Sequence, residues 1–413
     1  MSRELPSNIW LVLFLILGAF RWQRTVFPLQ DNCLLNIQLA AYQWKHGDIE
    51  WMYTPVDKTD EWRATWGPVT DSLGGDGLAN PYFYPPFLAA GLSPFSEFDA
   101  RSWRDVLFGI NVVLIFVNAW LILSVGGIPR TWRYFLWAFA LVLLTGPLAR
   151  STVMAQIVPF LAALTWLGLL RLREQKDLSG GVLLGVVSAI KLFPVGVIVV
   201  PAIARRFKAV WIWVATIFVI FGLSIWMMGF RVHQLFWQAT QQFGTLIYPY
   251  RHNQSLVGWF ARVFRDQPID TIVPSIDPGV RLAYTIIAII MAGVTVGWIW
   301  WNRRAIRPEN LHMFAALLMA GMILALSNSW DHYWMWLVPV MGWALYEEWT
   351  FGDSRARLVF ILVTGFLFIV KLSHFYNDSE VGRLVSGSHT VGMLMLWMWL
   401  IWRIRRTAQE AAL

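Results

Sequence analysis

Asp31 is the first residue in the chain whose type and surroundings suggest chemistry. It lies in the stretch PLQDNCLL, after an apolar run over residues 10–20 and before a predicted amphipathic helix over residues 34–44. A carboxylate beside such a run is costly to bury unless it is solvated or paired, which makes it a functional candidate. Partial desolvation also makes a carboxylate more basic, as a general base requires. Asp31 could equally cap the following helix, and the sequence leaves both interpretations open.

Two further stretches place cations and amides among apolar residues. Lys191 lies in SAIKLFPV, where Pro194 breaks or turns the helix. An ammonium group within an apolar run either reaches the membrane surface along its aliphatic stem or neutralises an anion. The sequence leaves both interpretations of Lys191 open. Arg150 and Gln156, in PLARSTVMAQ, offer further donors, although a simple turn at the interface would explain them as well.

Two polar loops complete the set of candidates. The loop YPYRHNQS carries Arg251, His252, Asn253 and Gln254 beside two tyrosines. This mixture suits sugar hydroxyls or a phosphate, but a solvated loop has the same composition. The loop SNSWDHYW carries Trp330, Asp331 and His332. A single histidine at an interface is more often structural, so the candidacy of His332 depends on its meeting Asp31 in space.

The composition places these residues in a membrane protein. Of the 413 residues, 57% are hydrophobic and only 14% are charged, whereas soluble domains carry about 25% charged residues. The net charge of +8 comes from short basic links between apolar runs, which orient a membrane protein and do not indicate a nucleic-acid partner. The single cysteine, Cys33, excludes an internal disulfide, and no metal-ligand spacing is present.

The basic residues also predict the topology. Apolar runs predict an all-α polytopic fold of about 12 spans in one domain, residues 1–413. Alternate loops hold arginine clusters, so those loops and both termini are predicted to be cytoplasmic. The opposite loops include two large extracytoplasmic segments, residues 21–101 and 231–278. The first is predicted to contain interfacial helices, including an apolar half-span over residues 84–95.

The order of the motifs resembles glycosyltransferase family 87. The motifs are Asp31 after the first span, NPYFYPPF with Tyr84, AQIVPFLAAL, SAIKLFP, NQSLVGWFAR and LSNSWDHYW. Members of this family are polyprenyl-phosphate-mannose-dependent α-mannosyltransferases with the GT-C membrane fold. Two departures are visible, because Asn328 and Tyr333 stand where the pattern often has proline and a second histidine.

The resemblance implies a site on the extracytoplasmic side of the plasma membrane and assigns roles within it. Asp31 matches the catalytic carboxylate, Lys191 the lysine near the donor phosphate, and His332 the histidine of the SW-x-H segment. Arg150 and Arg251 are expected to assist at the phosphate. The residues expected to contact the substrates are Tyr84, Gln156, His252, Asn253, Gln254, Trp330 and Asp331. The implied partners are a polyprenyl-phosphate-linked sugar donor, a glycolipid or glycan acceptor and the lipid bilayer.

Chemistry predicts that no cofactor or metal is needed. A polyprenyl phosphate carries little charge as a leaving group, so fixed lysine or arginine can neutralise it, and one carboxylate must accept the proton of the attacking hydroxyl. A transporter or flippase of a lipid-linked sugar is the main alternative, although such proteins usually place ionisable groups near the membrane midplane. A structural subunit of a membrane complex would need no buried carboxylate.

Overall fold

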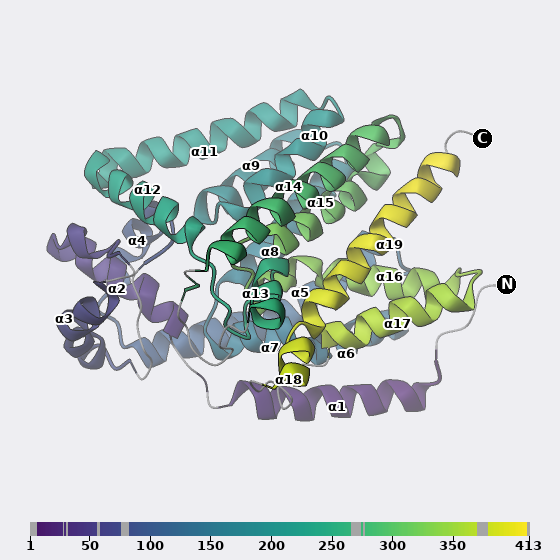
Figure 1. Ribbon diagram of the computed structural model, residues 1–413, viewed down its shortest axis with the longest axis horizontal. Helices are drawn as coiled ribbons and strands as arrows, with labels where there is room; N and C mark the ends of the chain where they lie inside the picture. Colours follow the sequence, from purple (N-terminus) through teal and green to yellow (C-terminus); the bar gives the residue numbers. More distant parts are fainter. Residues whose placement is uncertain are drawn as a thin grey trace.

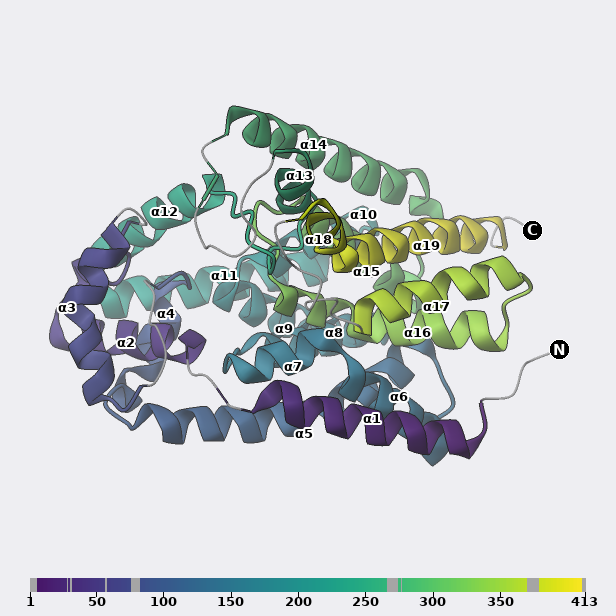
Figure 2. The same cartoon turned by 60° about the horizontal axis from the view of Figure 1, so that its bottom comes forward.

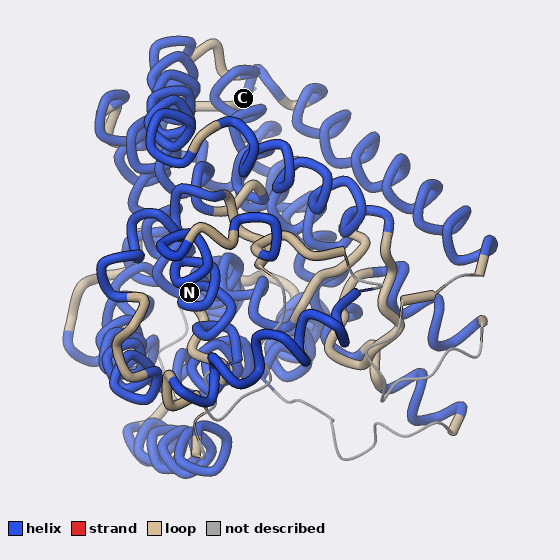
Figure 3. The backbone as a smooth tube through the Cα atoms, turned by 90° about the vertical axis from the view of Figure 1, so that its left-hand side faces the viewer, coloured by secondary structure: helices blue, strands red, loops and turns tan. Residues whose placement is uncertain are grey.

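The computed structural model describes residues 6–27, 29, 32–55, 58–75, 82–265, 274–275, 277–369 and 379–410. In this part of the chain the regular elements are helices, which confirms the all-α prediction (Figures 1 and 3). The first half contains α1 Asn8–Val26, α2 Asn32–His46, α3 Thr59–Ser72, α4 Pro86–Leu92, α5 Ala100–Gly126, α6 Trp132–Leu144, α7 Gly146–Val153, α8 Val158–Arg173 and α9 Asp177–Ile190. The second half contains α10 Val199–Ile203, α11 Phe207–Met228, α12 Phe230–Thr245, α13 Leu256–Phe264, α14 Pro278–Trp301, α15 Leu311–Ala325, α16 Val338–Thr350, α17 Arg355–Ile369, α18 Glu380–Val385 and α19 Ser388–Glu410.

Helix α15 lies at the centre of the bundle. All of its residues except Met322 and Ala325 are buried, and it packs against α14, α19 and α8. Its sequence, LHMFAALLMAGMILA, contains no charged side chain. A helix that is apolar on every face is stable only where other elements cover it on all sides, so α15 forms the core around which the other helices are arranged.

The outer helices α1, α11 and α14 expose apolar side chains. Ile9 on α1 is 73% exposed and Trp226 on α11 is 82% exposed. In water such surfaces would be unstable, whereas lipid tails solvate them. The exposed faces therefore indicate that these helices contact the bilayer.

Five helical segments in the described residues are long and apolar enough to cross a membrane. They are Ala100–Gly126, Phe207–Met228, Pro278–Trp301, Pro308–Ala325 and Glu380–Glu410. The pair α6 and α7 adds a sixth if it is counted as one span bent by 58°. The structure does not confirm the predicted number of about 12 spans, because several predicted apolar runs form short helices that breaks separate.

Two of these breaks lie at Lys191 and Asp331. After α9 ends at Ile190, Lys191 adopts an extended conformation, and a 3-10 helix, η4, covers Phe193–Ile198. After α15, the chain forms a second 3-10 helix, η7, over Asp331–Leu337 before α16 begins. Pro194 in η4 lacks the N–H group that a continuous helix needs there. Both breaks bring polar side chains into the end of the helix bundle.

The helices predicted for residues 21–101 are present in the described part of this segment. Helix α2 extends over the predicted amphipathic stretch, and α4 with the 3-10 helix Ser93–Phe95 forms the predicted half-span. Leu35 and Leu39 of α2 pack on Trp62 and Trp66 of α3. Figures 1 and 2 show α2, α3, α4 and α12 at one end of the molecule and both termini at the other.

The close packing of α9 on α11 gives a test of the fold. A Cβ atom added at Gly185 would lie 2.5 Å from Thr216 Cβ on α11, whereas one added at Gly109 on α5 would meet nothing within 4 Å. We expect Gly185→Ala to lower the free energy of unfolding by about 1–3 kcal/mol because the helices must separate. Gly109→Ala should leave it unchanged or raise it. Thermal unfolding of the purified protein in detergent measures both, and equal effects would contradict this packing.

Candidate functional site

The N-terminal turn of α2 meets the break between α7 and α8. Gln156 Nε2 lies 2.7 Å from the Cys33 sulfur atom, and the Tyr84 hydroxyl donates a hydrogen bond of 3.3 Å to Gln156 Oε1. Ala155 directs Gln156 toward these partners through a left-handed backbone conformation with φ of 47°. This conformation is uncommon for a residue other than glycine and occurs often at functional sites. Gln156 thus joins three segments that are far apart in the sequence.

Lys191 lies beside this contact. Its Nζ atom is 4.4 Å from the ring centroid of Tyr333 and 5.1 Å from that of Tyr84. Aromatic rings stabilise a cation by their quadrupole but do not neutralise its charge. Among the described residues, no carboxylate forms an ion pair with Lys191. We call Cys33, Tyr84, Gln156, Lys191 and Tyr333 the Lys191 cluster.

Burial controls the charge of Lys191. The residue lies between α9 and η4, outside the candidate spans. Desolvation lowers its pKa to about 7, so the ammonium form is easily lost near neutral pH. An anion bound next to Nζ would restore the ammonium form, because an opposite charge favours the charged state.

His332 lies within the electrostatic reach of four other ionisable side chains. Burial lowers its pKa well below the usual value, and the positive charge of Lys191 lowers it further, while Asp331 opposes both effects. Arg150 and His252 also act on it. The imidazole of His332 is therefore neutral at physiological pH. A neutral imidazole can donate one hydrogen bond and accept another without carrying charge.

His252 and Asp331 form a pair between the two predicted polar loops. His252 Nδ1 lies 2.8 Å from Asp331 Oδ2, and the Asp331 side chain is only 4% exposed. The two loops also pair through their backbones, since Gln254 N–H donates to Ser329 C=O and Asp331 N–H donates to His252 C=O. The contact places His252 next to the segment that carries His332.

The amide groups of Asn253 and Gln254 bind the protein itself. Asn253 Nδ2 donates to the carbonyl groups of Tyr248 and Ser327, and its Oδ1 accepts from Ser329 N–H at 2.8 Å. Gln254 Nε2 donates to the carbonyl groups of Arg251 and Ser386. Both residues are buried. In this structure they hold the two loops together, which is a different use from the substrate contact that the sequence predicted.

Arg150, Trp330 and Arg251 lie near the residues described above, and Asp31 has no described position. Arg150, on α7, acts electrostatically on both Cys33 and His332. Trp330 packs its ring at 6.1 Å from Tyr248 and at 6.3 Å from Tyr250. Arg251 is partly exposed in the turn before His252. Asp31 lies outside the described residues, although Asn32, the next residue in the chain, begins α2.

Sequence reasoning missed two residues that organise the site. Tyr333 was noted only as a departure from the family pattern, yet its ring is the nearer of the two over Lys191. Arg262, on α13, is fully buried and donates to the carbonyl groups of Pro249, Tyr250 and Asn253. An arginine in the middle of the apolar stretch LVGWFARVF was the available signal for the second residue.

The comparisons with known proteins agree with this architecture. The protein is helical and polytopic, and a cation, two histidines and a carboxylate lie at one end of its bundle. This arrangement is typical of an enzyme that acts at the membrane surface. The model of glycosyltransferase family 87 matches residues 82–329, more than half of the chain. No curated protein and no solved structure matches the chain significantly. The chain belongs to glycosyltransferase family 87, a family with the GT-C fold, and is a membrane glycosyltransferase.

The hydrogen bonds of Asn253 predict a structural role that can be measured. Asn253→Ala would remove the acceptor of the buried N–H groups of Ser255 and Ser329 and the donor to the Tyr248 carbonyl group, at a cost of about 1–3 kcal/mol for each unsatisfied group. We expect a lower melting temperature in detergent for this variant. Gln241→Ala, on the exposed face of α12, is the matched control and should melt like the wild type. Wild-type stability of Asn253→Ala would contradict the role assigned to this residue.

Proposed function

We propose that this glycosyltransferase transfers mannose from a polyprenyl-phosphate donor to a hydroxyl group of a lipid-linked or glycan acceptor. The transfer inverts the configuration at the anomeric carbon, and Asp31 is the general base. The observation that carries the proposal is the ammonium of Lys191, which lies over two aromatic rings without a described carboxylate partner. Membership of the family favours this reaction over transport of a lipid-linked sugar.

Lys191 is suited to the donor phosphate. A buried cation without a counter-ion is unfavourable, and a phosphate oxygen beside Nζ would remove that cost. Arg150 acts on the same region and can share the charge that develops on the leaving phosphate. The stacking of Tyr333 on Phe193 fixes one ring of the pair that holds Lys191 in place.

The chemical step needs one base and no strong acid. The acceptor oxygen attacks the anomeric carbon, the bond from that carbon to the phosphate oxygen breaks, and the phosphate leaves with the electron pair. Asp31 takes the proton of the attacking hydroxyl. The position of Asp31 directly before α2 supports this role, because Cys33 in the first turn of that helix contacts Gln156 of the site.

The other polar side chains are suited to hold the sugars. Neutral His332 can hydrogen-bond a hydroxyl group of the reacting sugar and is our second catalytic candidate. Asp331 orients His252, and both are suited to acceptor hydroxyl groups. The other proposed substrate contacts are made by Tyr84, Gln156 and Trp330. Arg251 is proposed to lie near the donor phosphate. Asn253 and Gln254 act indirectly, by shaping the loop that presents His252.

We place the site on the extracytoplasmic face of the plasma membrane and both termini in the cytoplasm. The arginine clusters lie at residues 130–133, 171–173, 205–206, 303–307, 355–357 and 403–406. These clusters lie in the last turns of helices that lead away from the site, or between such a helix and the next one, as the positive-inside rule requires for the cytoplasmic side. A lipid-linked donor fits this location, because its lipid carries the sugar across the bilayer.

The base can be tested by direct assay. Purified protein in nanodiscs is mixed with radiolabelled mannosyl phosphoryl polyprenol and membrane glycolipids, with and without EDTA. We expect label to appear in a new glycolipid, to persist in EDTA, and to fall by about 10²–10⁴-fold in Asp31→Asn, since a positioned base contributes that factor. Donor binding should remain. The matched control, Asp48→Asn, replaces an exposed acid of the same loop and should be fully active. Full activity of Asp31→Asn would show that another group is the base.

The charge of Lys191 predicts a pH dependence of donor binding. With a pKa of about 7, the ammonium fraction falls about tenfold between pH 6 and pH 8. The donor phosphodiester stays ionised throughout, so the donor KM should rise about tenfold over this interval. Burial raises the pKa of Cys33 to about 11 and the pKa of Tyr333 to about 12. These two neighbours of Lys191 therefore do not titrate between pH 6 and pH 8.

Lys191→Arg is the matched control for this profile. A guanidinium stays charged at every pH of the assay, so the donor KM of this variant should be flat between pH 6 and pH 8. A wild-type profile that survives in Lys191→Arg would assign the pH dependence to a different group.

A further inference from the structure

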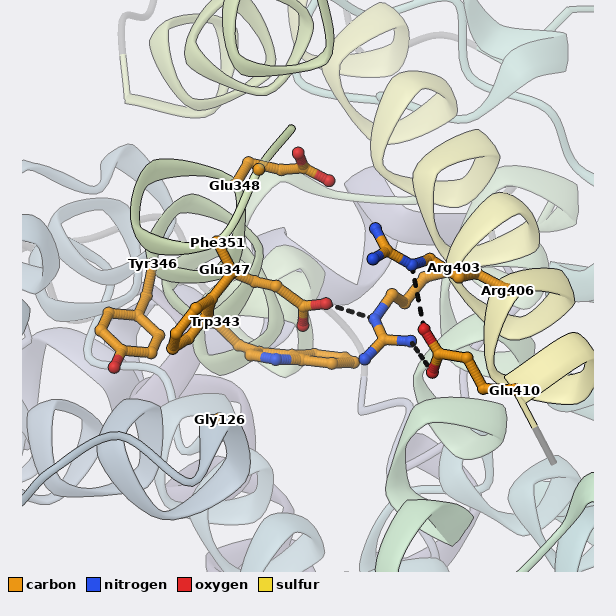
Figure 4. Close-up of a pocket in the computed structure, with 10 residues that line it drawn as sticks. Gly126, Trp343, Tyr346, Glu347, Glu348, Phe351, Arg403, Arg406 and Glu410 are labelled. Atoms are coloured by element: carbon orange, nitrogen blue, oxygen red, sulfur yellow. Dashed lines mark hydrogen bonds and ion pairs between the residues drawn. The ribbon is translucent and has the colours of Figure 1, made fainter. Parts of the chain in front are cut away.

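Two adjoining cavities lie at the ends of α16 and α19 that are remote from the proposed site. The inner cavity, of about 260 Å³, is lined by Trp343, Glu347, Glu348, Arg403, Arg406 and Glu410, among others (Figure 4). The outer cavity, of about 440 Å³, is lined by Asp353, Arg357, Trp402, Arg405, Arg406 and Gln409. Helix α16 runs from η7, which carries His332, to Thr350, so the inner cavity and His332 lie at opposite ends of that helix.

The charges of the inner cavity are neutralised within the protein. Figure 4 shows Glu347 paired with Arg403, and Glu410 placed between Arg403 and Arg406. Glu348 accepts a hydrogen bond of 2.9 Å from the indole of Trp399 and lies 3.4 Å from Arg357 Nε. A further ion would have to displace these pairs, so the inner cavity is not suited to an anion.

The outer cavity holds one arginine without an ion pair among the described residues. Three arginines line it: Arg357 pairs with Asp353, Arg406 pairs with Glu410 of the inner cavity, and Arg405 has no such partner. The guanidinium carbon atoms of Arg357 and Arg406 lie 4.3 Å and 5.8 Å from the ring centroid of Trp402. Arg405 is exposed, and no ion pair links it to another described residue. The planar indole thus fixes two guanidinium groups beside a third that reaches solvent.

We propose that the outer cavity binds the phosphate group of an anionic membrane lipid. Guanidinium groups recognise phosphate oxygens through paired, charge-assisted hydrogen bonds. Gln409 adds an amide donor at the rim. The three arginines come from two helices, α17 and α19, so a bound phosphate would also join the C-terminal helix to its neighbour.

The position along α19 favours a lipid over a soluble phosphate. The segment Glu380–Glu410 is apolar enough to cross a membrane, and Trp402 follows the apolar residues Trp399, Leu400 and Ile401 of that segment. Tryptophan is enriched at the level of the lipid headgroups, and arginine clusters beside the end of a span bind anionic lipids. The cavity therefore lies where headgroup phosphates are concentrated.

Binding of short-chain lipids to the purified full-length protein in nonionic detergent tests the proposal. The probes are dioctanoyl phosphatidylglycerol, dioctanoyl phosphatidylcholine and inorganic phosphate, and native mass spectrometry counts the bound molecules. We expect the wild type to bind phosphatidylglycerol preferentially. Arg405→Gln should weaken this binding about fivefold, since one basic residue near an anionic lipid contributes about that factor. Arg405→Gln combined with Arg406→Gln should weaken it more.

The controls separate the outcomes. Arg405→Lys should restore most of the binding, and Arg304→Gln, an exposed arginine in a different basic loop, should bind like the wild type. Arg405 is exposed and forms no ion pair with another described residue, so its substitution should leave the melting temperature and sugar transfer unchanged. Equal binding of the two lipids, or unchanged binding in the double variant, would overturn the proposal. Binding of inorganic phosphate that fully displaces the lipid headgroup would show a site for a soluble anion instead.

Discussion

The structure of the site depends on the cost of burying the ammonium group of Lys191. Helix α9 ends at Ile190, and the extended backbone at Lys191 directs the residue into contact with Tyr84 and Tyr333. The rings lower the cost of the charge but leave it without a counter-ion in the described part of the chain. Burial therefore makes the site receptive to an anion, and the donor phosphate is the anion that a family 87 glycosyltransferase with a lipid-linked substrate would supply.

The loops at this end of the bundle are held by buried polar groups that hydrogen-bond to the protein itself. Asn253 joins its own loop to Ser327 and Ser329. Arg262, on α13, donates hydrogen bonds to three backbone carbonyl groups of the same loop. Such fully bonded buried groups rigidify a loop, because any movement leaves a donor or an acceptor unsatisfied. His252 and Asp331 are presented on this rigid support, which suits the sugar contacts that we propose for them.

Local signals predicted much of the fold and of the site, and long-range packing accounts for the rest. The apolar period predicted α2, and Pro194 predicted the break at Lys191. The number of membrane spans could not be predicted from the sequence, because breaks such as the one before η7 divide apolar runs into short helices. The role of Tyr333 could not be read either, since it depends on Lys191 lying beside a residue far along the chain. The order of motifs, in contrast, identified the family, because it needs no geometry.

A structure of the protein with an unreactive polyprenyl-phosphate-sugar analogue would show whether Lys191 binds the donor phosphate. Electron cryomicroscopy in nanodiscs would locate the phosphate. We predict a phosphate oxygen within hydrogen-bonding distance, about 3 Å, of Lys191 Nζ, with the sugar between the first turn of α2 and His332. An analogue bound elsewhere, with Lys191 still over Tyr84 and Tyr333 and no anion beside it, would contradict the proposed role of Lys191.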